Sequence, residues 1–183
     1  MCVGYRRVNG QTTKNKYPLP RQDDIFDAMH GAKLFTTLDL QQAYHQVRLK
    51  EADIPKTAFV THMGQFEYRV LCFGLTNAPS TFQALMNRIL APYINKFCVV
   101  YLDDIMIYSK SPEEHLMHLR QVLQAFRDHQ FYCRIHKCKF ALRSIPFLGH
   151  IISEHGISID SGKAKVVQWT GLLQPTFLSS DLS

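Results

Sequence analysis

Two adjacent carboxylates interrupt an apolar run in the middle of the chain. Asp103 and Asp104 separate "KFCVVYL" from "IMIYS", and both segments are typical of buried strands. Unpaired charge beside a core is costly, so the pair must face solvent, contact a cation or pair with a basic group. Asp39 also ends a strand-like run. Three carboxylates that converge from two strands could hold a divalent metal.

Magnesium suits such a site because it binds oxygen ligands at about 2.0–2.1 Å and keeps positions open for water and phosphate oxygens. Two such ions, about 3.5–4 Å apart, can activate a hydroxyl and stabilise the leaving oxygen in phosphoryl transfer. The site requires the Asp39 strand to lie beside the Asp103 strand, at a separation of about 4.8 Å. The alternative is a plain hairpin turn at Asp103-Asp104, since Asp is common in turns. The pair alone leaves both interpretations open.

Extended segments position these carboxylates. A strand is expected to run to Asp39, with a turn or short helix after it. Residues 56–71 predict a hairpin with Met63-Gly64 as its turn. The apolar segments around Asp103-Asp104 predict two tightly joined strands, and "FLGHIISEHGISID" predicts a closing hairpin.

Three helices are expected to support the strands. "RQDDIFDAMHGAK" predicts a short helix opened by acidic residues and closed by Gly31. A second helix follows Asn77, and a third is capped by Ser111. Mixed helices and hairpins predict an α+β domain. The apolar faces predicted are Phe82, Leu85, Met86, Ile89 and Leu90 in the second helix, and Leu116, Leu119, Leu123 and Phe126 in the third.

Composition narrows the class of protein. The 183 residues suit one domain, and the net charge of +6 with a sequence pI near 9.1 makes nucleic acid or another polyanion a natural partner. No apolar run approaches the roughly 20 residues of a membrane span, so no membrane partner is expected. Five irregularly spaced cysteines predict no disulfide framework and an intracellular, cytoplasmic or nuclear, location. "CRIHKC" has two cysteines and one histidine, fewer ligands than the four that structural zinc usually binds.

The segment "YLDDIMIYSKS" resembles the aromatic-x-Asp-Asp motif of reverse transcriptases, in the form carried by gypsy-class long-terminal-repeat retrotransposons. The resemblance extends from about Cys2 to Trp169. Further segments occur in that family's order and spacing: "KNKYPLPRQDDIFDAMHGAKLFTTLDLQQAYHQV", "IPKTAF", "FGLTNAPSTFQALMN", "EEHLMHLRQVLQAFRDH" and "FLGHIIS".

The resemblance implies a fold and an activity. The fold would be the palm and partial fingers of a right-hand reverse transcriptase, a small antiparallel sheet backed by helices, in residues 1–169. The activity would be RNA-directed DNA polymerisation, in which a DNA primer on an RNA or DNA template is extended with deoxynucleoside triphosphates. Two Mg2+ ions would be required, with Mn2+ able to replace them. Oligomeric state is left open.

Site residues also follow from the resemblance. Asp39, Asp103 and Asp104 would be the catalytic, metal-binding triad. Tyr44 would lie beneath the incoming sugar and clash with a 2′-hydroxyl; without the family it reads as a core aromatic on a short helix. The nucleotide site would also include Phe73, Gly74 and Leu102. Pro79 and the hairpin residues Phe147, Leu148 and Gly149 would bind template and primer, although "FLGH" also reads as an ordinary strand and Gly74 as a turn residue. Lys14, Lys16, Arg21 and Lys56 could meet phosphates or be solvated charges.

Several positions depart from the family pattern. Gly4 and Gly10 replace a usual Asp and a common Lys, Cys72 replaces a usual Pro, and Pro146 interrupts a strand, which predicts an edge position for it. After Trp169 the resemblance ends, so residues 170–183 are interpreted as an unrelated or frameshifted, disordered tail of a truncated pol polyprotein. The alternative function is an inactive retroelement remnant that at most binds nucleic acid.

Overall fold

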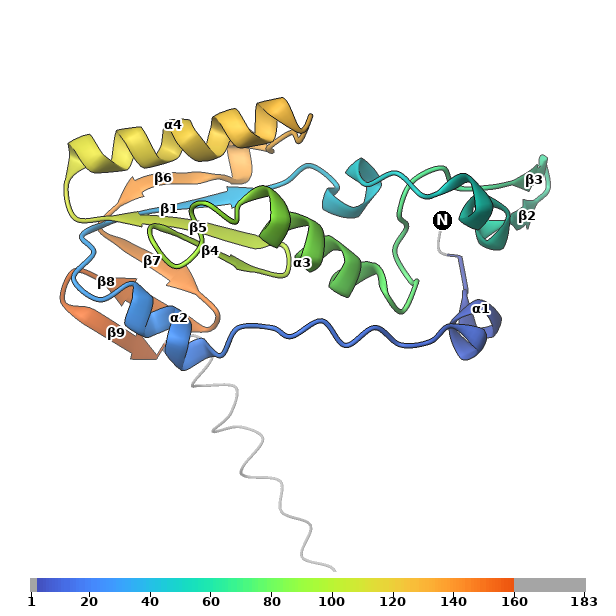
Figure 1. Ribbon diagram of the computed structural model, residues 1–183, viewed down its shortest axis with the longest axis horizontal. Helices are drawn as coiled ribbons and strands as arrows, with labels where there is room; N and C mark the ends of the chain where they lie inside the picture. Colours follow the sequence, from blue (N-terminus) through green and yellow to red (C-terminus); the bar gives the residue numbers. More distant parts are fainter. Residues whose placement is uncertain (1–2, 160–183) are drawn as a thin grey trace, which may run out of the picture.

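A four-stranded antiparallel sheet carries the acidic segments, in a computed structural model that describes residues 3–159 (Figure 1). The strand order is β4-β5-β1-β6. The strands are β4 (Cys98–Tyr101), β5 (Asp104–Ser109), β1 (Leu34–Asp39) and β6 (Lys139–Leu142).

Strand β5 is the centre of the packing because both of its faces are buried. Ile105 and Ile107 belong to one apolar cluster, whereas Met106 and Tyr108 belong to another. Successive side chains of a strand point to opposite faces, so the two clusters lie on opposite sides of the sheet. Burial on both faces explains why this segment reads as a continuous apolar run rather than an alternating one.

Different elements cover the two faces. Phe82 and Met86 of α3 (Ala78–Ile89) and Phe126 of α4 (Pro112–Asp128) pack in the cluster of Ile105. The cluster of Met106 includes Ile25 of α2 (Gln22–Ala28) and residues of a second, three-stranded sheet. That sheet has the order β7-β8-β9 and lies below the first in Figure 1. Its strands are β7 (Ser144–Phe147), β8 (His150–Ser153) and β9 (Gly156–Ile159).

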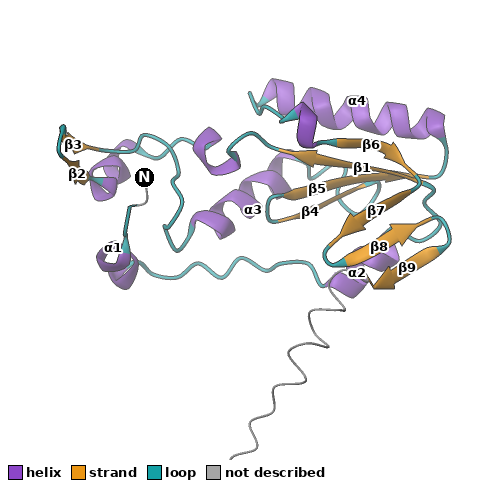
Figure 2. Cartoon of the chain, turned by 180° about the vertical axis from the view of Figure 1, so that it is seen from behind, coloured by secondary structure: helices purple, strands orange, loops and turns teal. Residues whose placement is uncertain are grey.

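An outer lobe projects to one side of the sheets, as both ribbon views show (Figures 1 and 2). It contains α1 (Arg6–Gln11), the 3-10 helix η2 (Glu51–Thr57) and the hairpin of β2 (Phe59–Thr61) and β3 (Gly64–Phe66). An extended segment, residues 12–21, runs from α1 back to α2. Two more 3-10 helices, η1 (Ala43–Gln46) and η3 (Ile135–Lys137), complete the described elements.

The expected strand neighbours are confirmed. Asp39 and Asp104 are paired residues at the end of the β1–β5 ladder, and Tyr101 pairs with Asp104 across β4 and β5. Asp103 lies in the turn between those strands. The three carboxylates therefore come to one end of the sheet.

Turn positions are each shifted by one residue from the prediction. The β4–β5 turn is Leu102-Asp103, because Asp104 already pairs with Tyr101 and Leu102 takes the bend with φ +53°. The β2–β3 turn is His62-Met63 rather than Met63-Gly64, and Gly64, with φ +127°, opens β3. A positive φ suits glycine, which lacks the Cβ that would clash there.

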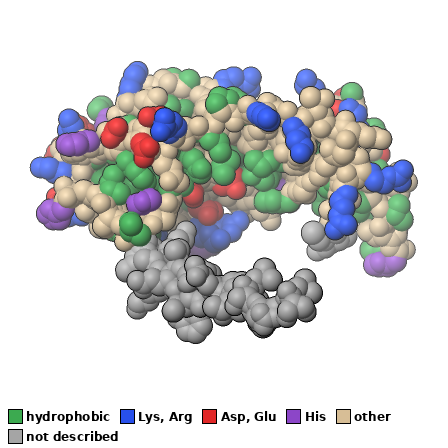
Figure 3. Space-filling view, turned by 90° about the horizontal axis from the view of Figure 1, so that it is seen from below, with side chains coloured by type: hydrophobic (Ala, Val, Ile, Leu, Met, Phe, Trp, Pro, Cys, Tyr) green, Lys and Arg blue, Asp and Glu red, His purple; other side chains and the backbone are tan. Residues whose placement is uncertain are grey.

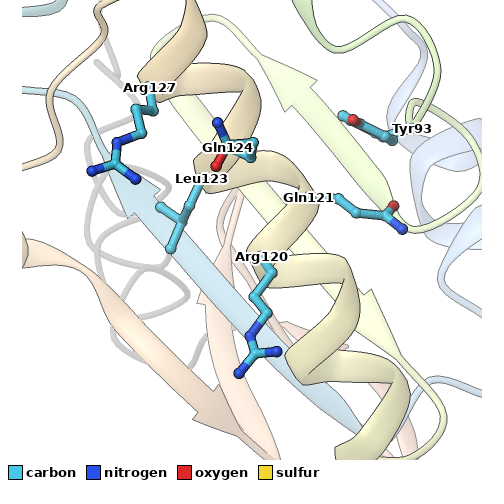
Figure 4. A pocket seen from close by; sticks show the side chains of 6 residues that line it. All are labelled: Tyr93, Arg120, Gln121, Leu123, Gln124 and Arg127. Atoms are coloured by element: carbon cyan, nitrogen blue, oxygen red, sulfur yellow. The ribbon is translucent and has the colours of Figure 1, made fainter.

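The predicted apolar face of α4 is confirmed at Phe126 and Leu119, which pack in or against the cluster of Ile105, and is wrong at Leu116 and Leu123. The helix buries His115, Val122 and Phe126, while Leu116 and Leu123 are exposed. The polar ring of His115 is drawn inward because it hydrogen bonds Thr36 and Ser109 of the sheet. Leu123 instead lines a cavity of about 720 Å³ on the outer side of the helix, with Tyr93, Arg120, Gln121, Gln124 and Arg127 (Figure 4).

Other predictions concern caps, edges and termini. The Ser111 hydroxyl accepts a 3.2 Å hydrogen bond from the Glu114 N–H, which confirms the cap of α4. Pro146 lies in β7, an edge strand, as expected. The closing hairpin is confirmed as β8 and β9, and it gains a third strand because β7 pairs with β8. The predicted tail lies outside the described residues.

Of the helices in residues 3–159, none has the length and apolar character that a bilayer crossing requires.

Candidate active site

The acidic end of the sheet concentrates negative charge. Burial raises the pKa of Asp103, and the charges of Asp104 and Asp39 raise it further, while the Tyr44 hydroxyl acts in the opposite direction. Burial and the charge of Asp39 also raise the pKa of Asp104. Both side chains reach solvent, so apolar neighbours desolvate them only in part. The site therefore holds like charges that a cation would stabilise.

Asp39 has its own partners. Its carboxylate lies 3.9 Å from the Arg134 guanidinium, and its carbonyl accepts a 2.8 Å hydrogen bond from the Arg134 N–H. The Asp39 N–H donates to the Cys138 sulfur at 3.4 Å. Within residues 3–159, no three His, Cys, Asp or Glu side chains are grouped closely enough to hold a metal ion. The three carboxylates are thus neighbours, but they are not a preassembled cluster.

Gln83 holds the turn that carries Asp103. Its side chain is completely buried in α3, its amide oxygen accepts a 2.6 Å hydrogen bond from the Leu102 N–H, and its amide nitrogen donates to the Val100 carbonyl at 3.1 Å. The same nitrogen donates to the Asn87 side chain, which donates to the Tyr17 hydroxyl. These bonds satisfy the buried amide of Gln83. They also hold Leu102, whose backbone has a left-handed conformation, against α3.

Tyr44 and Phe73 form an aromatic pair beside the carboxylates. Their ring centroids are 4.8 Å apart, and Tyr44 also contacts Phe82 edge-on at 5.5 Å. Burial, followed by the charge of Asp103, raises the pKa of Tyr44 to about 12. Tyr44 is buried on the 3-10 helix η1, whereas Phe73 is exposed. The tyrosine is therefore both a core residue and a neighbour of the acidic end.

A cavity of about 340 Å³ adjoins the acidic end of the sheet and brings the predicted primer hairpin to it. Phe147, Leu148 and Gly149 line it, and the last two have positive φ, +49° and +81°, in the β7–β8 turn. Its full lining is Thr37, Leu38, Asp39, Asp104, Lys137, Lys139, Pro146, Phe147, Leu148 and Gly149. Viewed from below, acidic side chains lie in a recessed part of the surface, next to hydrophobic side chains and with basic side chains on one side (Figure 3).

Other predicted residues lie farther from this cavity. Pro79 is exposed in the first turn of α3, and Gly74 has φ +96° in the loop before that helix; neither lines the cavity. Of the basic residues, Lys56 pairs with Asp53 at 2.6 Å and Arg21 lies 3.6 Å from Asp23. These two are therefore at least partly neutralised by local carboxylates.

Sequence reasoning missed Gln83, Arg134 and Cys138 as partners of the acidic residues. A signal for Gln83 existed, because a glutamine three residues before Met86 falls on the apolar face of its helix. Arg134 and Cys138 gave no comparable signal, since their contacts with Asp39 span about a hundred residues of sequence.

Comparison with known proteins gives a consistent result. A family model described as reverse transcriptase (RNA-dependent DNA polymerase) matches residues 1–152. The chain is 42% identical over 167 residues to the retrovirus-related Pol polyprotein from transposon 297 of Drosophila melanogaster, covering 91% of this chain but only 16% of that protein. It is 52% identical over 128 residues to an RNA-directed DNA polymerase homolog of Oenothera berteroana, covering 68% of this chain and 90% of that protein.

A solved structure supports the fold. The foamy viral protease-reverse transcriptase in complex with an RNA/DNA hybrid is similar with a TM-score of 0.80 and 23% sequence identity. The match covers 91% of this chain and 22% of that one.

Proposed function

Because the chain belongs to the reverse transcriptase family, we propose that it provides the palm and part of the fingers of an RNA-directed DNA polymerase. In this reaction a primer 3′-hydroxyl attacks the α-phosphorus of a deoxynucleoside triphosphate. A phosphodiester bond forms, the bond to the β-phosphate breaks, and pyrophosphate leaves. We assign the catalytic and metal-binding roles to Asp39, Asp103 and Asp104.

The observation that carries this proposal is the strand register. Asp39 pairs with Asp104, and Asp103 lies in the adjoining turn, so three carboxylates from two strands share one end of a sheet. Burial, followed by the charges of neighbouring carboxylates, raises the pKa values of Asp103 and Asp104, as expected where acidic side chains gather. A plain hairpin turn needs neither feature.

Magnesium fits the chemistry of these donors. All three are carboxylates, the hard oxygen ligands that Mg2+ prefers. Bound divalent metal supplies activation of the primer hydroxyl and stabilisation of the leaving pyrophosphate. To ligate it, the Asp39 carboxylate would turn away from Arg134, and Asp103 and Asp104 would adopt rotamers that bring their oxygens together.

The remaining residues would position the substrates. Tyr44 and Phe73 would form an aromatic floor for the incoming nucleotide, with Gly74 and Leu102 beside it, and the rigid, packed ring of Tyr44 would oppose a 2′-hydroxyl. Phe147, Leu148 and Gly149 would hold the primer end across the cavity from Asp104. Pro79 would contact the template strand, which would be RNA or DNA.

Primer extension tests this function directly. The chain would be incubated with an RNA template, a DNA primer, Mg2+ and deoxynucleotides, beside an Asp103→Ala, Asp104→Ala variant. We expect the variant to lose activity by at least about a hundredfold, as loss of groups that act on the transition state does. Asp128→Ala, in which the lost carboxylate only accepts a hydrogen bond from Gln124 on α4, is the matched control.

Each outcome is informative. Extension that vanishes in the double variant and persists in Asp128→Ala supports the polymerase. A folded chain that binds template–primer without extending it would contradict the polymerase and favour the alternative, a non-catalytic nucleic-acid-binding remnant.

A further inference from the structure

The loop between Cys72 and α3 carries a nucleotide-site residue without support from regular structure. No helix or strand includes residues 73–77. Phe73, its first residue, is 58% exposed, yet its ring lies 4.8 Å from that of Tyr44. An exposed side chain on an irregular loop keeps one position only if the backbone beneath it is held.

Asn9 of α1 holds the middle of this loop from the far end of the sequence. Its amide nitrogen donates a 2.7 Å hydrogen bond to the Gly74 carbonyl, and its amide oxygen accepts a 2.8 Å bond from the Thr76 N–H. One side chain thus satisfies a backbone acceptor and a backbone donor two residues apart. A carboxamide suits this role because its donor and its acceptor are separate atoms that can bond at the same time.

Asn77 makes the reciprocal pair of bonds to the N-terminal segment. Its amide nitrogen donates to the Thr13 carbonyl and its oxygen accepts from the Asn15 N–H, both at 2.9 Å. Asn77 is the N-cap residue of α3, a position where asparagine usually bonds the first helical N–H groups, but here it makes no such bond. Its side chain is committed to the N-terminal segment instead of to its own helix.

The N-terminal segment also packs directly over Gly74. A Cβ added at Gly74 would lie 3.4 Å from the Tyr5 ring, and the glycine has φ +96°. Tyr5 is buried, and its hydroxyl donates to the Thr57 carbonyl of the outer lobe at 3.1 Å. The segment is therefore anchored at one end and bonded to the loop at the other.

We propose that Asn9 and Asn77 form a clasp through which residues 5–15 position Phe73 for the incoming deoxynucleotide. The inference rests on the proposed function. Both asparagines are positioning residues, since their amides bond protein backbone and act on the pocket through the loop. With the clasp closed, the loop is ordered before the nucleotide arrives, so less ordering entropy is lost on binding. Losing the clasp should therefore weaken nucleotide binding more than the chemical step.

Two variants and one control test the clasp. Asn9→Ala removes both bonds to the loop, and Asn77→Ser removes both bonds to residues 13 and 15 while keeping a side chain that can cap α3. Thr12→Val is the control, because the Thr12 hydroxyl bonds only Val8 within the same segment. Melting temperatures would establish that each full-length variant is folded. If Asn9→Ala does not fold, Asn77→Ser alone tests the clasp.

Two measurements separate positioning from general stability. Hydrogen exchange followed by mass spectrometry should speed up in peptides that cover residues 74–77 in both asparagine variants, and stay unchanged in β1 and β5. In primer extension, KM for the deoxynucleotide should rise about tenfold, the effect of losing one or two hydrogen bonds, with kcat within about threefold. Thr12→Val should leave both quantities unchanged.

Different results would contradict the polymerase function and the clasp. An unsubstituted chain that does not extend primers would overturn the proposed function, and with it the nucleotide role of the clasp. An active chain whose asparagine variants keep the parent KM, or whose Thr12→Val variant raises KM equally, would overturn the clasp alone.

Discussion

At the scale of single residues, the acidic end of the sheet places charge where the fold disfavours it. Burial, followed by the charges of neighbouring aspartates, raises the pKa values of Asp103 and Asp104, so ionising them costs more in the folded state than in the unfolded chain. Such sites are expected where function rather than stability selects the residue. The residue types and the strand-like runs around them predicted that the three carboxylates could converge, and the strand pairing confirms this. Their metal-binding role came from the family resemblance and stays a prediction.

Neutralising Asp104 should therefore stabilise the fold. Because the pKa of Asp104 is higher in the folded state than in the unfolded chain, stability is lost as pH rises from the unfolded value through the folded pKa. Asp104→Asn should raise the free energy of unfolding at pH 7 by up to about 1 kcal/mol, an amount limited by solvent screening, and Tm by roughly 2–4 °C. The gain should disappear near pH 3, where the parent carboxylate is protonated.

Thermal unfolding with and without Mg2+ checks this prediction. Asp53→Asn is the contrasting control, because Lys56 lowers the pKa of Asp53 and removing that charge should give no gain. Mg2+ should raise the Tm of the parent chain more than that of Asp104→Asn, since a ligand stabilises only the state that binds it. A Tm for Asp104→Asn at or below the parent value would contradict the electrostatic argument.

At the scale of elements, the helix pattern predicted where α4 lies in sequence but only part of the face that it buries, since Leu119 and Phe126 pack in or against the core. Leu116 and Leu123 fit an apolar stripe, yet the buried row runs from His115 through Val122 to Phe126. The sequence gives no hint that the sheet offers two hydroxyls to a histidine. Thr36 is 2.7 Å from one ring nitrogen of His115, and Ser109 is 2.9 Å from the other.

This buried network should make stability depend on pH. Burial and the charge of His118 lower the pKa of His115, and burial lowers that of His118 against the opposing charge of Glu114. A lowered folded pKa means that the unfolded chain binds more protons, so stability should fall as pH drops from the unfolded value, about 6.5, through the folded pKa values. Urea unfolding at several pH values between 7.5 and 5 would measure the slope.

A variant isolates the contribution of His115. His115→Gln should cost about 1–3 kcal/mol at pH 7.5, because it disturbs buried hydrogen bonds, but its stability should change less between pH 7.5 and 5 than that of the parent. His136→Gln, on the exposed surface of η3, is the control and should keep the parent slope. An undiminished slope in His115→Gln would show that other groups cause the acid sensitivity.

At the scale of the whole molecule, the α+β class and the family resemblance were both predicted correctly, because the motif order spans most of the chain. What could not be predicted is how distant segments meet. Asn9 bonds Gly74 and Arg134 lies beside Asp39, contacts that no local period encodes. The positive φ at Leu102 and Leu148 was equally hidden, since leucine does not favour that conformation.

The distribution of charge around the cavity leads to a prediction about nucleic acid. Lys137 and Lys139 line the 340 Å³ cavity beside the β7–β8 turn, whereas Lys110 follows β5 at the opposite end from Asp104. If the primer backbone passes through the cavity, each lining lysine neutralises a phosphate and releases about one counterion. Lys137→Ala and Lys139→Ala should each weaken template–primer binding irrespective of sequence and reduce the slope of log K against log salt by about 1. Lys110→Ala should keep the parent slope in the same fluorescence-anisotropy titrations, and an equal reduction in all three variants would indicate that the chain attracts nucleic acid through its net charge alone.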